Sequence, residues 1–390
     1  MMRAWVIRPE RLGDPEHAMQ LEQIEVPEPG PGEVLVRVMA AGVNYNAVWA
    51  SMGLPVSIFR YTGYDFHIAG SDASGIVERV GPGVTRWKAG DEVVIHCNQS
   101  CGECAECNGL DPMACTQQKI WAYESNWGSF AEFCKVQAQQ LLPKPPQLTW
   151  EAAASYGLTY FTAYRMLIDQ GGIKAGDNVL VWGAGGGLGT FAVQLCALVG
   201  ANAVAVVSSN DKVELVKELG AAAIIDRREF ALSDPDTGER IFDEVKRFGK
   251  AVRAATGGVD PDVVFEHVGA ATFYTSVFVC KPFGTIVICG ATSGHTLDFD
   301  VRYLWMRQKR IIGSHFANAW ECHRANELIE AGKVRPVLWR TLGFEQVAEA
   351  HQLMYENKHL GKIAILVGAE AEGLGKTADG PGAIRAEVGA

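Results

Sequence analysis

The sequence contains no apolar run long enough to cross a membrane, and its beginning lacks the apolar core of a secretion signal. Positive charge is also scarce, because the formal net charge is −10 at pH 7. Such a chain does not attract nucleic acid over its whole surface, and a phosphorylated ligand would need a local basic patch. These absences predict a cytoplasmic protein with neither a membrane nor a nucleic acid as its partner.

The composition is that of an ordinary globular protein, and 390 residues suffice for two domains. Up to about residue 150, short apolar runs are separated by Pro/Gly turns, which predicts a β-rich, barrel-like domain. Beyond it, helical stretches alternate with apolar runs such as 203–207, 262–265 and 284–288. This alternation predicts an α/β domain with a doubly wound parallel sheet. After a last helix (324–331) and strand (362–367), the Gly/Ala-rich end is expected to be a surface extension or poorly ordered.

Residues 179–200 (VLVWGAGGGLGTFAVQLCALVG) read as a strand, a tight glycine turn and a helix. Glycines let the backbone turn sharply, approach a pyrophosphate and direct free helix N-terminal amides at it. The spacing is that of a dinucleotide fingerprint with alanine in the first glycine's place. A glycine-rich hairpin is the alternative. The predicted cofactor contacts in this turn are Ala184, Gly186, Gly187, Leu188 and Gly189.

The end of the next strand indicates which dinucleotide binds. A site for NADH usually holds an acidic residue there, which would repel a 2′-phosphate. Here Ser208, Ser209 and Asn210 occupy that end, and Lys212 follows. Two hydroxyls and a lysine favour NADPH, with Asp211 leaving NADH as the alternative.

Five of the ten cysteines fall between residues 97 and 115. Cys101, Cys104, Cys107 and Cys115 are separated by two, two and seven residues. Four thiolates on one loop can surround a zinc ion tetrahedrally and leave no position open for a substrate. The spacing predicts a structural Zn²⁺, with free buried cysteines as the alternative and Cys97 as a spare thiol.

A β-rich first domain, a glycine turn in mid-chain and a return to the first domain resemble the medium-chain dehydrogenase/reductase superfamily. The resemblance implies a GroES-like catalytic domain (1–155 and 312–370), a Rossmann NADPH-binding domain (156–311) and a C-terminal extension (371–390). It also implies a homodimer or homotetramer.

Alcohol dehydrogenases of this superfamily bind a catalytic zinc ion, and this chain has different residues at the positions that match their zinc ligands. Asn44 and the segment Gly70-Ser71-Asp72 offer neither thiolate nor imidazole. Without a Lewis acid on an alcohol or carbonyl oxygen, the sequence favours hydride addition to a C=C bond conjugated to a carbonyl or thioester.

Five segments resemble the sequences of crotonyl-CoA carboxylase/reductases, also called enoyl-CoA carboxylases/reductases. They are residues 42–49, 121–128, 262–267, 302–306 and 310–318. The resemblance implies NADPH-dependent reduction of a short-chain 2-enoyl-CoA, crotonyl-CoA or acrylyl-CoA, with hydride to Cβ. CO2 is then trapped at Cα to give an alkylmalonyl-CoA.

The same resemblance places the CO2 pocket at Asn44, Tyr123, Glu124 and His315, with tyrosine where the family has phenylalanine. An amide and an imidazole can donate to the oxygens of CO2, and the acid can orient one of them through water.

The nucleotide ligands have further expected contacts. The resemblance implies a CoA contact at Arg302 and Tyr303, where a guanidinium binds phosphate and tyrosine stacks on adenine. Lys309 and Arg310 are expected to be solvated charges. His267 is expected to line the cofactor cleft.

Alternatives remain for the residues and for the function. Asn44 can be a turn former, Glu124 a solvated loop charge and His315 a core histidine. The reduction can end with a proton instead of CO2, if the Tyr123 hydroxyl admits water. The chain can also be a quinone or enone reductase of free small molecules, or a redox-inactive NADPH-binding protein.

Overall fold

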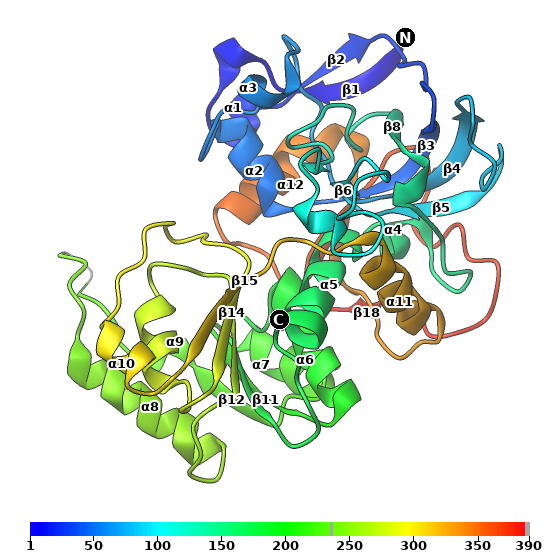
Figure 1. Cartoon of the computed structure of the whole chain (residues 1–390). Coiled ribbons are helices and arrows are strands. Elements are labelled where there is room, and N and C mark those ends of the chain that lie inside the picture. The colour runs from blue at the N-terminus through cyan, green and yellow to red at the C-terminus, as the bar shows by residue number, and fades with distance from the viewer. Residues whose placement is uncertain (235–236, 387–390) are drawn as a thin grey trace. The chain divides into compact units, whose positions relative to one another are not determined.

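The computed structural model describes residues 1–234 and 237–386, and these form two compact units (Figure 1). Unit 1 comprises residues 1–161 and 317–386, and unit 2 comprises residues 162–316. Residues 387–390 of the expected C-terminal extension lie outside the described residues. Within the described ranges, no helix is both long enough and apolar enough to cross a bilayer.

Unit 2 is built on a six-stranded sheet in which every pairing is parallel. The hydrogen-bonded order is β12-β11-β10-β13-β14-β15, so the chain starts in the middle and fills first one side and then the other. This is the doubly wound arrangement that the sequence predicts, and its order reverses between β10 and β13, where such sheets bind ligands. The strands are β10 (Asn178–Val181), β11 (Asn202–Val207), β12 (Ala223–Asp226), β13 (Val263–Glu266), β14 (Thr285–Ile288) and β15 (Arg310–Gly313).

The helices of unit 2 bury apolar stripes against this sheet. On α8, Val245, Phe248 and Val252 are buried at helical spacing, and the ring of Trp182 stacks on Phe248 with centroids 5.0 Å apart. In Figure 1, α8 lies beside α9, and α9 lies beside α10. The helices are α6 (Gly187–Val199), α7 (Asp211–Glu218), α8 (Phe242–Ala255), α9 (Phe273–Val279) and α10 (Val301–Trp305), preceded by a π-helical segment, η4 (Arg165–Gln170).

Unit 1 is organised around a curled sheet with β3 at its centre. The order is β18-β16-β17-β3-β4-β5-β9, and β8 also pairs with β3. Val34, Val36 and Val38 of β3 are fully buried in the core of this unit. The strands are β1 (Met2–Val6), β2 (Gln20–Ile24), β3 (Glu33–Gly42), β4 (Ala73–Val80), β5 (Glu92–Ile95), β6 (Asn98–Gln99), β7 (Lys119–Ile120), β8 (Phe133–Gln137), β9 (Leu141–Pro143), β16 (Val337–Gly343), β17 (Lys362–Leu366) and β18 (Ile384–Arg385).

The last third of unit 1 holds more structure than the sequence predicts. Between the expected last helix and the expected last strand lie β16 and α12, whose short apolar patterns were missed. The helices of this unit are α1 (Pro15–Ala18), α2 (Tyr45–Met52), α3 (Phe59–Thr62), α4 (Trp150–Ala153), α5 (Gly157–Tyr164, which continues into unit 2), α11 (Ala319–Glu330) and α12 (Val347–Tyr355).

The Gly/Ala-rich segment was expected to be a surface extension or poorly ordered. As far as residue 386, it is instead packed against unit 1. Its strand β18 pairs with β16. Gly375 packs so closely on the indole of Trp150 that a Cβ would lie 2.5 Å from the ring nitrogen, and Lys144 Nζ donates to the Gly375 carbonyl over 2.6 Å. Arg385 forms an ion pair with Glu372 at 2.8 Å. These contacts join the described part of this segment to the rest of unit 1.

Three buried histidines make the stability of unit 1 depend on pH. His67, His96 and His351 each hydrogen-bond one ring nitrogen to a backbone carbonyl, and burial lowers the pKa of each to about 4. The folded state therefore favours neutral imidazole, and its stability is full above the unfolded pKa and is lost as pH falls from about 6.5 toward 4.

Between pH 7 and pH 5, each of these histidines is expected to cost about 2 kcal/mol of unfolding free energy. Denaturant titrations at the two pH values measure this loss. The variant His351→Asn keeps a donor for the Val347 carbonyl without titrating, and it should reduce the pH dependence by about one histidine's share. Unfolding free energies that are equal at both pH values would refute this assignment.

Candidate functional site

The glycine turn of unit 2 connects β10 to α6 as the fingerprint requires. Gly183 has a φ of +57°, and α6 begins at Gly187 after Gly186, with no side chain capping its first amides. A Cβ on Gly189 would lie 2.3 Å from the Gly183 carbonyl oxygen, so only glycine lets the first turn of α6 pack on the strand end. Free amides at Gly187, Leu188 and Gly189 form the kind of N-terminus that binds a pyrophosphate.

Side chains at the ends of β11 and β12 provide positive charge beside this turn. The aliphatic stem of Lys212 packs against Gly185, because a Cβ there would lie 2.7 Å from Lys212 Cγ. Burial lowers the pKa of Lys212, and the charge of Asp211 opposes that shift. Among the residues that the structure describes, the buried hydroxyl of Ser209 has no hydrogen-bond partner, whereas Ser208 is exposed. An unpaired hydroxyl and a nearby lysine suit a 2′-phosphate.

Sequence reasoning missed Arg228 as a candidate at this place. Its Nη2 donates to Asn210 Oδ1 over 2.6 Å, and its guanidinium pairs with Asp226 at 2.5 Å. Arg228 lies 18 residues from Asn210 in the sequence, so only the pairing of β12 with β11 brings it to the strand end. An arginine in this position is a known means of holding a 2′-phosphate.

His267 contacts the glycine turn itself. Its Nε2 donates to the carbonyl of Trp182 over 3.0 Å, and a Cβ on Gly183 would lie 3.0 Å from the ring. Burial lowers the pKa of His267, so the neutral ring is favoured. The contacts place His267 beside the glycine turn.

In unit 1, Asn44 lies at the start of α2 within a buried polar network. Its Nδ2 donates to Asp72 Oδ2 over 2.8 Å, and Lys362 Nζ donates to Asn44 Oδ1 over 2.5 Å. The side chain does not cap α2, so Asn44 is not the turn former that the alternative proposed. Burial raises the pKa of Asp72 and lowers that of Lys362, while the attraction between the two opposes both shifts.

A second chain of hydrogen bonds joins the start of α2 to the turn after β7. Asn46 Nδ2 donates to Ser71 Oγ over 2.7 Å, and Ser71 in turn donates to the carbonyl of Trp121 over 2.8 Å. Thus the positions that match zinc ligands of alcohol dehydrogenases hold Asn44 and Ser71, each engaged in hydrogen bonds. The network also brings segments 42–49 and 121–128 of unit 1 to one region.

Tyr123 and Glu124 lie in that turn. The Tyr123 hydroxyl donates to the carbonyl of Leu54, just beyond the end of α2, over 2.7 Å. Glu124 is half-buried, and its Oε2 accepts from the amide of Ile120 over 2.8 Å. Glu124 is therefore tied to its own turn rather than being a freely solvated charge, and it lines a pocket of about 510 Å³ in unit 1.

His315 belongs to unit 2, where it follows β15 and is exposed. Its ring packs edge-on against Phe316 with centroids 4.5 Å apart. An exposed imidazole at the end of a strand is not the hydrogen-bonded core histidine of the alternative.

A basic pocket of about 390 Å³ in unit 2 lies between α8, the end of α9 and the segment after α10. Its cationic residues outnumber the single carboxylate of Asp260, which pairs with one of them, Arg253, at 2.6 Å. Tyr303 lines this pocket, whereas Arg302 is exposed and pairs with Asp300 at 2.6 Å. The cationic residues of this basic pocket are Lys246, Lys250, Arg253, Arg307 and Lys309.

Lys309 is not the solvated charge that was expected from the sequence. It is only 8% exposed, and its Nζ donates to the carbonyls of Val277 and Phe278 over 2.6 and 3.3 Å. These carbonyls belong to the last turn of α9, where backbone acceptors lack helix partners and attract a cation. Arg310 is exposed, as expected.

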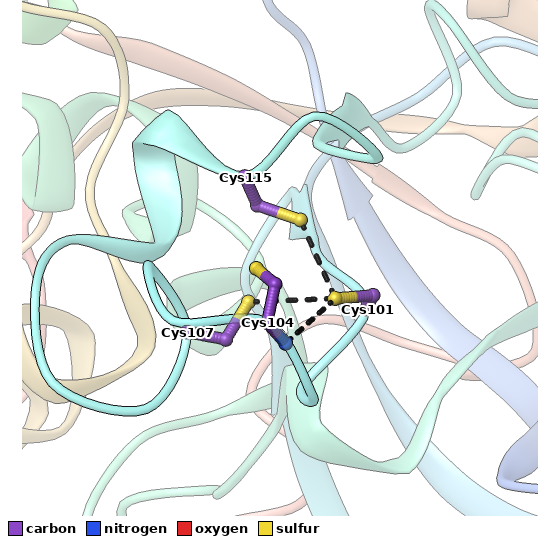
Figure 2. A group of neighbouring side chains, drawn as sticks. All are labelled: Cys101, Cys104, Cys107 and Cys115. Carbon is purple, nitrogen blue, oxygen red and sulfur yellow. Dashed lines mark hydrogen bonds between the residues drawn. The ribbon is translucent and has the colours of Figure 1, made fainter.

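The four cysteines of unit 1 are turned toward one another (Figure 2). Their sulfur atoms lie within 4.8 Å of each other, with Cys101 Sγ 3.6 Å from that of Cys115 and 3.9 Å from that of Cys107. Tetrahedral zinc with Zn–S bonds of about 2.3 Å requires sulfur separations of about 3.8 Å. Amides of Glu103 and Cys104 donate to Cys101 Sγ over 3.4 Å each. The donor set fits a structural zinc ion.

Comparison with known proteins identifies the relatives of the chain. An alcohol dehydrogenase GroES-like domain model matches residues 30–146, and a zinc-binding dehydrogenase model matches residues 187–331. The crotonyl-CoA carboxylase/reductase of Cereibacter sphaeroides is 50% identical over 389 residues, which covers 97% of this chain and 90% of that protein.

Solved structures agree with this match. The 2-octenoyl-CoA carboxylase reductase CinF, in complex with NADP and 2-octenoyl-CoA, superposes with a TM-score of 0.92 at 40% identity, covering 96% of this chain and 90% of that one. The crotonyl-CoA carboxylase/reductase AntE, in complex with NADP, gives a TM-score of 0.89 at 44% identity, covering 95% of both chains. The predicted GroES-like and Rossmann domains are confirmed. The chain belongs to the crotonyl-CoA carboxylase/reductase family of the medium-chain dehydrogenase/reductase superfamily.

Proposed function

We propose that the chain reduces a short-chain 2-enoyl-CoA with NADPH and carboxylates the product, giving an alkylmalonyl-CoA. Hydride adds to Cβ, the electrons of the C=C bond move to Cα, and the resulting enolate forms a C–C bond to CO2. The hydride becomes the new C–H bond at Cβ, CO2 alone becomes the carboxylate on Cα, and NADP⁺ is released, so no proton is consumed. The observation that carries the proposal is Asn44, an amide fixed by Asp72 and Lys362 in the place of a zinc ligand.

The remaining pocket residues have roles compatible with this chemistry. Asn44 and His315 donate hydrogen bonds to the oxygens of CO2, and Glu124 orients one of them through water. The Tyr123 hydroxyl is bound to the Leu54 carbonyl. Its donor is thus occupied, which reduces the risk that it holds a water molecule able to protonate the enolate. This favours carboxylation over the simple reductase.

NADPH is the proposed hydride source and binds at the glycine turn. The amides of α6 face the pyrophosphate, while Ser209, Lys212 and Arg228 hold the 2′-phosphate. His267 lies beside the same turn. The cofactor supplies the hydride, and the side chains at the ends of β11 and β12 select its phosphorylated form.

Removing the lysine tests this selection. Lys212→Ala is expected to weaken NADPH binding about 10- to 100-fold and to leave NADH binding unchanged, because one charge-assisted hydrogen bond is lost. Lys217→Ala on the same helix is the matched control, since Lys217 is exposed and pairs with Glu214. Equal losses for both cofactors in fluorescence titrations would show that Lys212 does not contact the 2′-phosphate.

The basic pocket is the proposed site for the nucleotide end of CoA, whose phosphates need local positive charge on a chain of net charge −10. Tyr303 can stack on the adenine, and the cations around it can bind the phosphates. Arg302 would reach a phosphate only by exchanging its Asp300 partner.

We also propose that the four-cysteine cluster holds structural zinc. Purified protein should contain about one zinc per chain by elemental analysis, because a closed four-thiolate set binds zinc tightly. Cys104→Ser should lower the zinc content and the stability of unit 1. Cys97→Ser is the matched control, because Cys97 is a buried cysteine outside the cluster and its loss should leave the zinc in place. Metal-replete protein without zinc would remove this proposal.

The oligomeric state and the cellular location are also part of the proposal. We expect a cytoplasmic homodimer or homotetramer, as the family resemblance implies, which light scattering and cell fractionation would measure.

The reductive step is tested by following NADPH oxidation with crotonyl-CoA, acrylyl-CoA and free enones. The proposal predicts turnover with the thioesters and far slower turnover with NADH or with free enones. Equal rates with free enones would favour a quinone or enone reductase. Cofactor binding without turnover on any of these compounds would favour a redox-inactive protein.

A further inference from the structure

Asp72 and Lys362 form an ion pair that is enclosed within unit 1. Their side chains are 0% and 2% exposed, and Lys362 Nζ lies 3.2 Å from Asp72 Oδ2. The three ammonium protons of Lys362 have three acceptors, namely Asp72, Asn44 Oδ1 at 2.5 Å and the Val43 carbonyl at 2.9 Å. A buried pair of this kind is expensive to form and is weak evidence for stability alone.

Two glycines make room for Asp72 at this place. A Cβ on Gly42 would lie 3.1 Å from Asp72 Oδ2 and 2.2 Å from a backbone oxygen, and one on Gly157 would lie 2.6 Å from Asp72 Oδ1. Asp72 Oδ1 accepts from the amide of Leu158 over 2.5 Å, which anchors the carboxylate to the start of α5. The carboxylate is therefore held by backbone on one side and presents its other oxygen to Asn44.

The pair determines which way the Asn44 amide faces. Its nitrogen donates to the anion, and its oxygen accepts from the cation. Rotating the amide by half a turn would set its oxygen against the carboxylate and its NH2 group against the ammonium, so both contacts would become repulsive. A neutral pair of partners would not impose this choice.

The orientation leaves one donor for a ligand. The NH2 group of Asn44 has two protons, and one of them is bound to Asp72. Within residues 1–234 and 237–386, the other proton has only a contact of 3.5 Å to the Gly42 carbonyl, which is at the limit of a hydrogen bond. Its direction is fixed as long as the amide cannot turn.

From this geometry we propose that Asp72 and Lys362 are positioning residues for carboxylation, acting through Asn44. The pair fixes the amide so that its free N–H points at the oxygen of CO2, in the place where related dehydrogenases hold a metal. This inference rests on the proposed function, because it takes Asn44 as a CO2 contact.

Charge removal separates positioning from stability. Lys362→Met leaves the Asp72 carboxylate buried without its cation, so it should lower both stability and the ratio of carboxylated to reduced product. The double variant Asp72→Asn/Lys362→Met removes both charges and should regain most of the stability. Its neutral partners permit both amide orientations, and the product ratio with crotonyl-CoA, NADPH and saturating CO2 should stay at least tenfold below wild type.

Two comparisons make the result specific. Lys144→Met is the matched control, because Lys144 is also a lysine with a buried side chain in an ion pair of unit 1, with Glu92, away from Asn44. It should lower stability and leave the product ratio unchanged. In a double-mutant cycle, Asn44→Ala should lower the ratio in the wild type but add nothing to Lys362→Met, because both changes remove the same contact.

Each outcome decides the question. If the double variant regains the wild-type ratio together with its stability, or if the effects of Asn44→Ala and Lys362→Met multiply, the pair is merely structural. Should Lys362→Met fail to fold, the double variant and its Asn44→Ala derivative carry the same test.

A spectroscopic readout keeps this inference distinct from the proposed function. With ¹⁵N-labelled asparagine, the wild-type Asn44 side chain should give two separate amide proton signals protected from solvent exchange. The double variant should lose this protection. If wild-type protein yields only reduced product while the Asn44 signals behave as expected, the proposed function fails and the fixed amide stands. Unchanged Asn44 signals in the double variant would overturn the inference whatever the product.

Discussion

Gly189→Ala is expected to lower the free energy of unfolding of unit 2 by about 2–3 kcal/mol, since overpacking of rigid backbone costs that much. A Cβ at this position would lie 2.3 Å from the Gly183 carbonyl oxygen and 2.5 Å from the Cα of Ala184. Both are backbone atoms of the turn, so relief requires α6 to move away from β10. Urea titration of the cofactor-free protein measures the loss.

Gly186→Ala is the matched change at the adjacent fingerprint position, and it should behave differently. Its Cβ would meet only the Gly183 carbonyl oxygen at 3.3 Å, so the free protein should fold nearly as the wild type does. The added methyl group would stand where the pyrophosphate approaches the N-terminus of α6, and NADPH affinity should fall at least tenfold, or about 1.4 kcal/mol. Equal stability losses in the two variants, or unchanged NADPH affinity in Gly186→Ala, would contradict the assignment.

The second large effect is expected in the basic pocket. Lys250→Glu combined with Arg307→Glu should raise the KM for crotonyl-CoA about 100-fold or more, because two charge-assisted contacts are lost and repulsion replaces them. Both side chains line the pocket and are exposed, so folding should be unaffected. Steady-state kinetics over a wide range of substrate concentration would give KM and kcat separately.

Two controls confine that effect to the nucleotide end of the substrate. Crotonyl-pantetheine lacks the nucleotide, and its kcat/KM should be the same for the variant and the wild type. Lys174→Glu reverses an exposed charge of unit 2 that does not line the basic pocket. A KM for crotonyl-CoA that is unchanged in the double variant, or raised equally by Lys174→Glu, would mean that CoA binds elsewhere.

The features that sequence predicts best are those written in consecutive residues. The glycine turn and its flanking apolar runs predict β10 and α6, and the alternation of apolar runs with helices predicts the parallel sheet. The cysteine spacing predicts a cluster because all four ligands lie on one loop. In each case the pattern lies in consecutive residues, so it can be recognised without knowledge of tertiary structure.

Contacts between distant segments account for what sequence did not predict. Lys362 reaches Asn44 across 318 residues, and neither residue alone indicates that the other fixes it. Lys309 was expected in solvent because its neighbours are polar, whereas the carbonyls that bury it belong to α9. Arg228 reaches the end of β11 only because β12 pairs there. Gly375 and β18 are held by Trp150 and β16, which lie far from them in sequence.

The central claim is that the enolate formed by hydride transfer is captured by CO2. Its most direct test is product analysis by mass spectrometry after turnover of crotonyl-CoA with NADPH, ¹³C-bicarbonate and carbonic anhydrase. The account predicts ethylmalonyl-CoA carrying one ¹³C atom as the main product, and butyryl-CoA when CO2 is removed. Butyryl-CoA as the sole product at saturating CO2 would contradict it and identify the chain as a reductase without carboxylase activity.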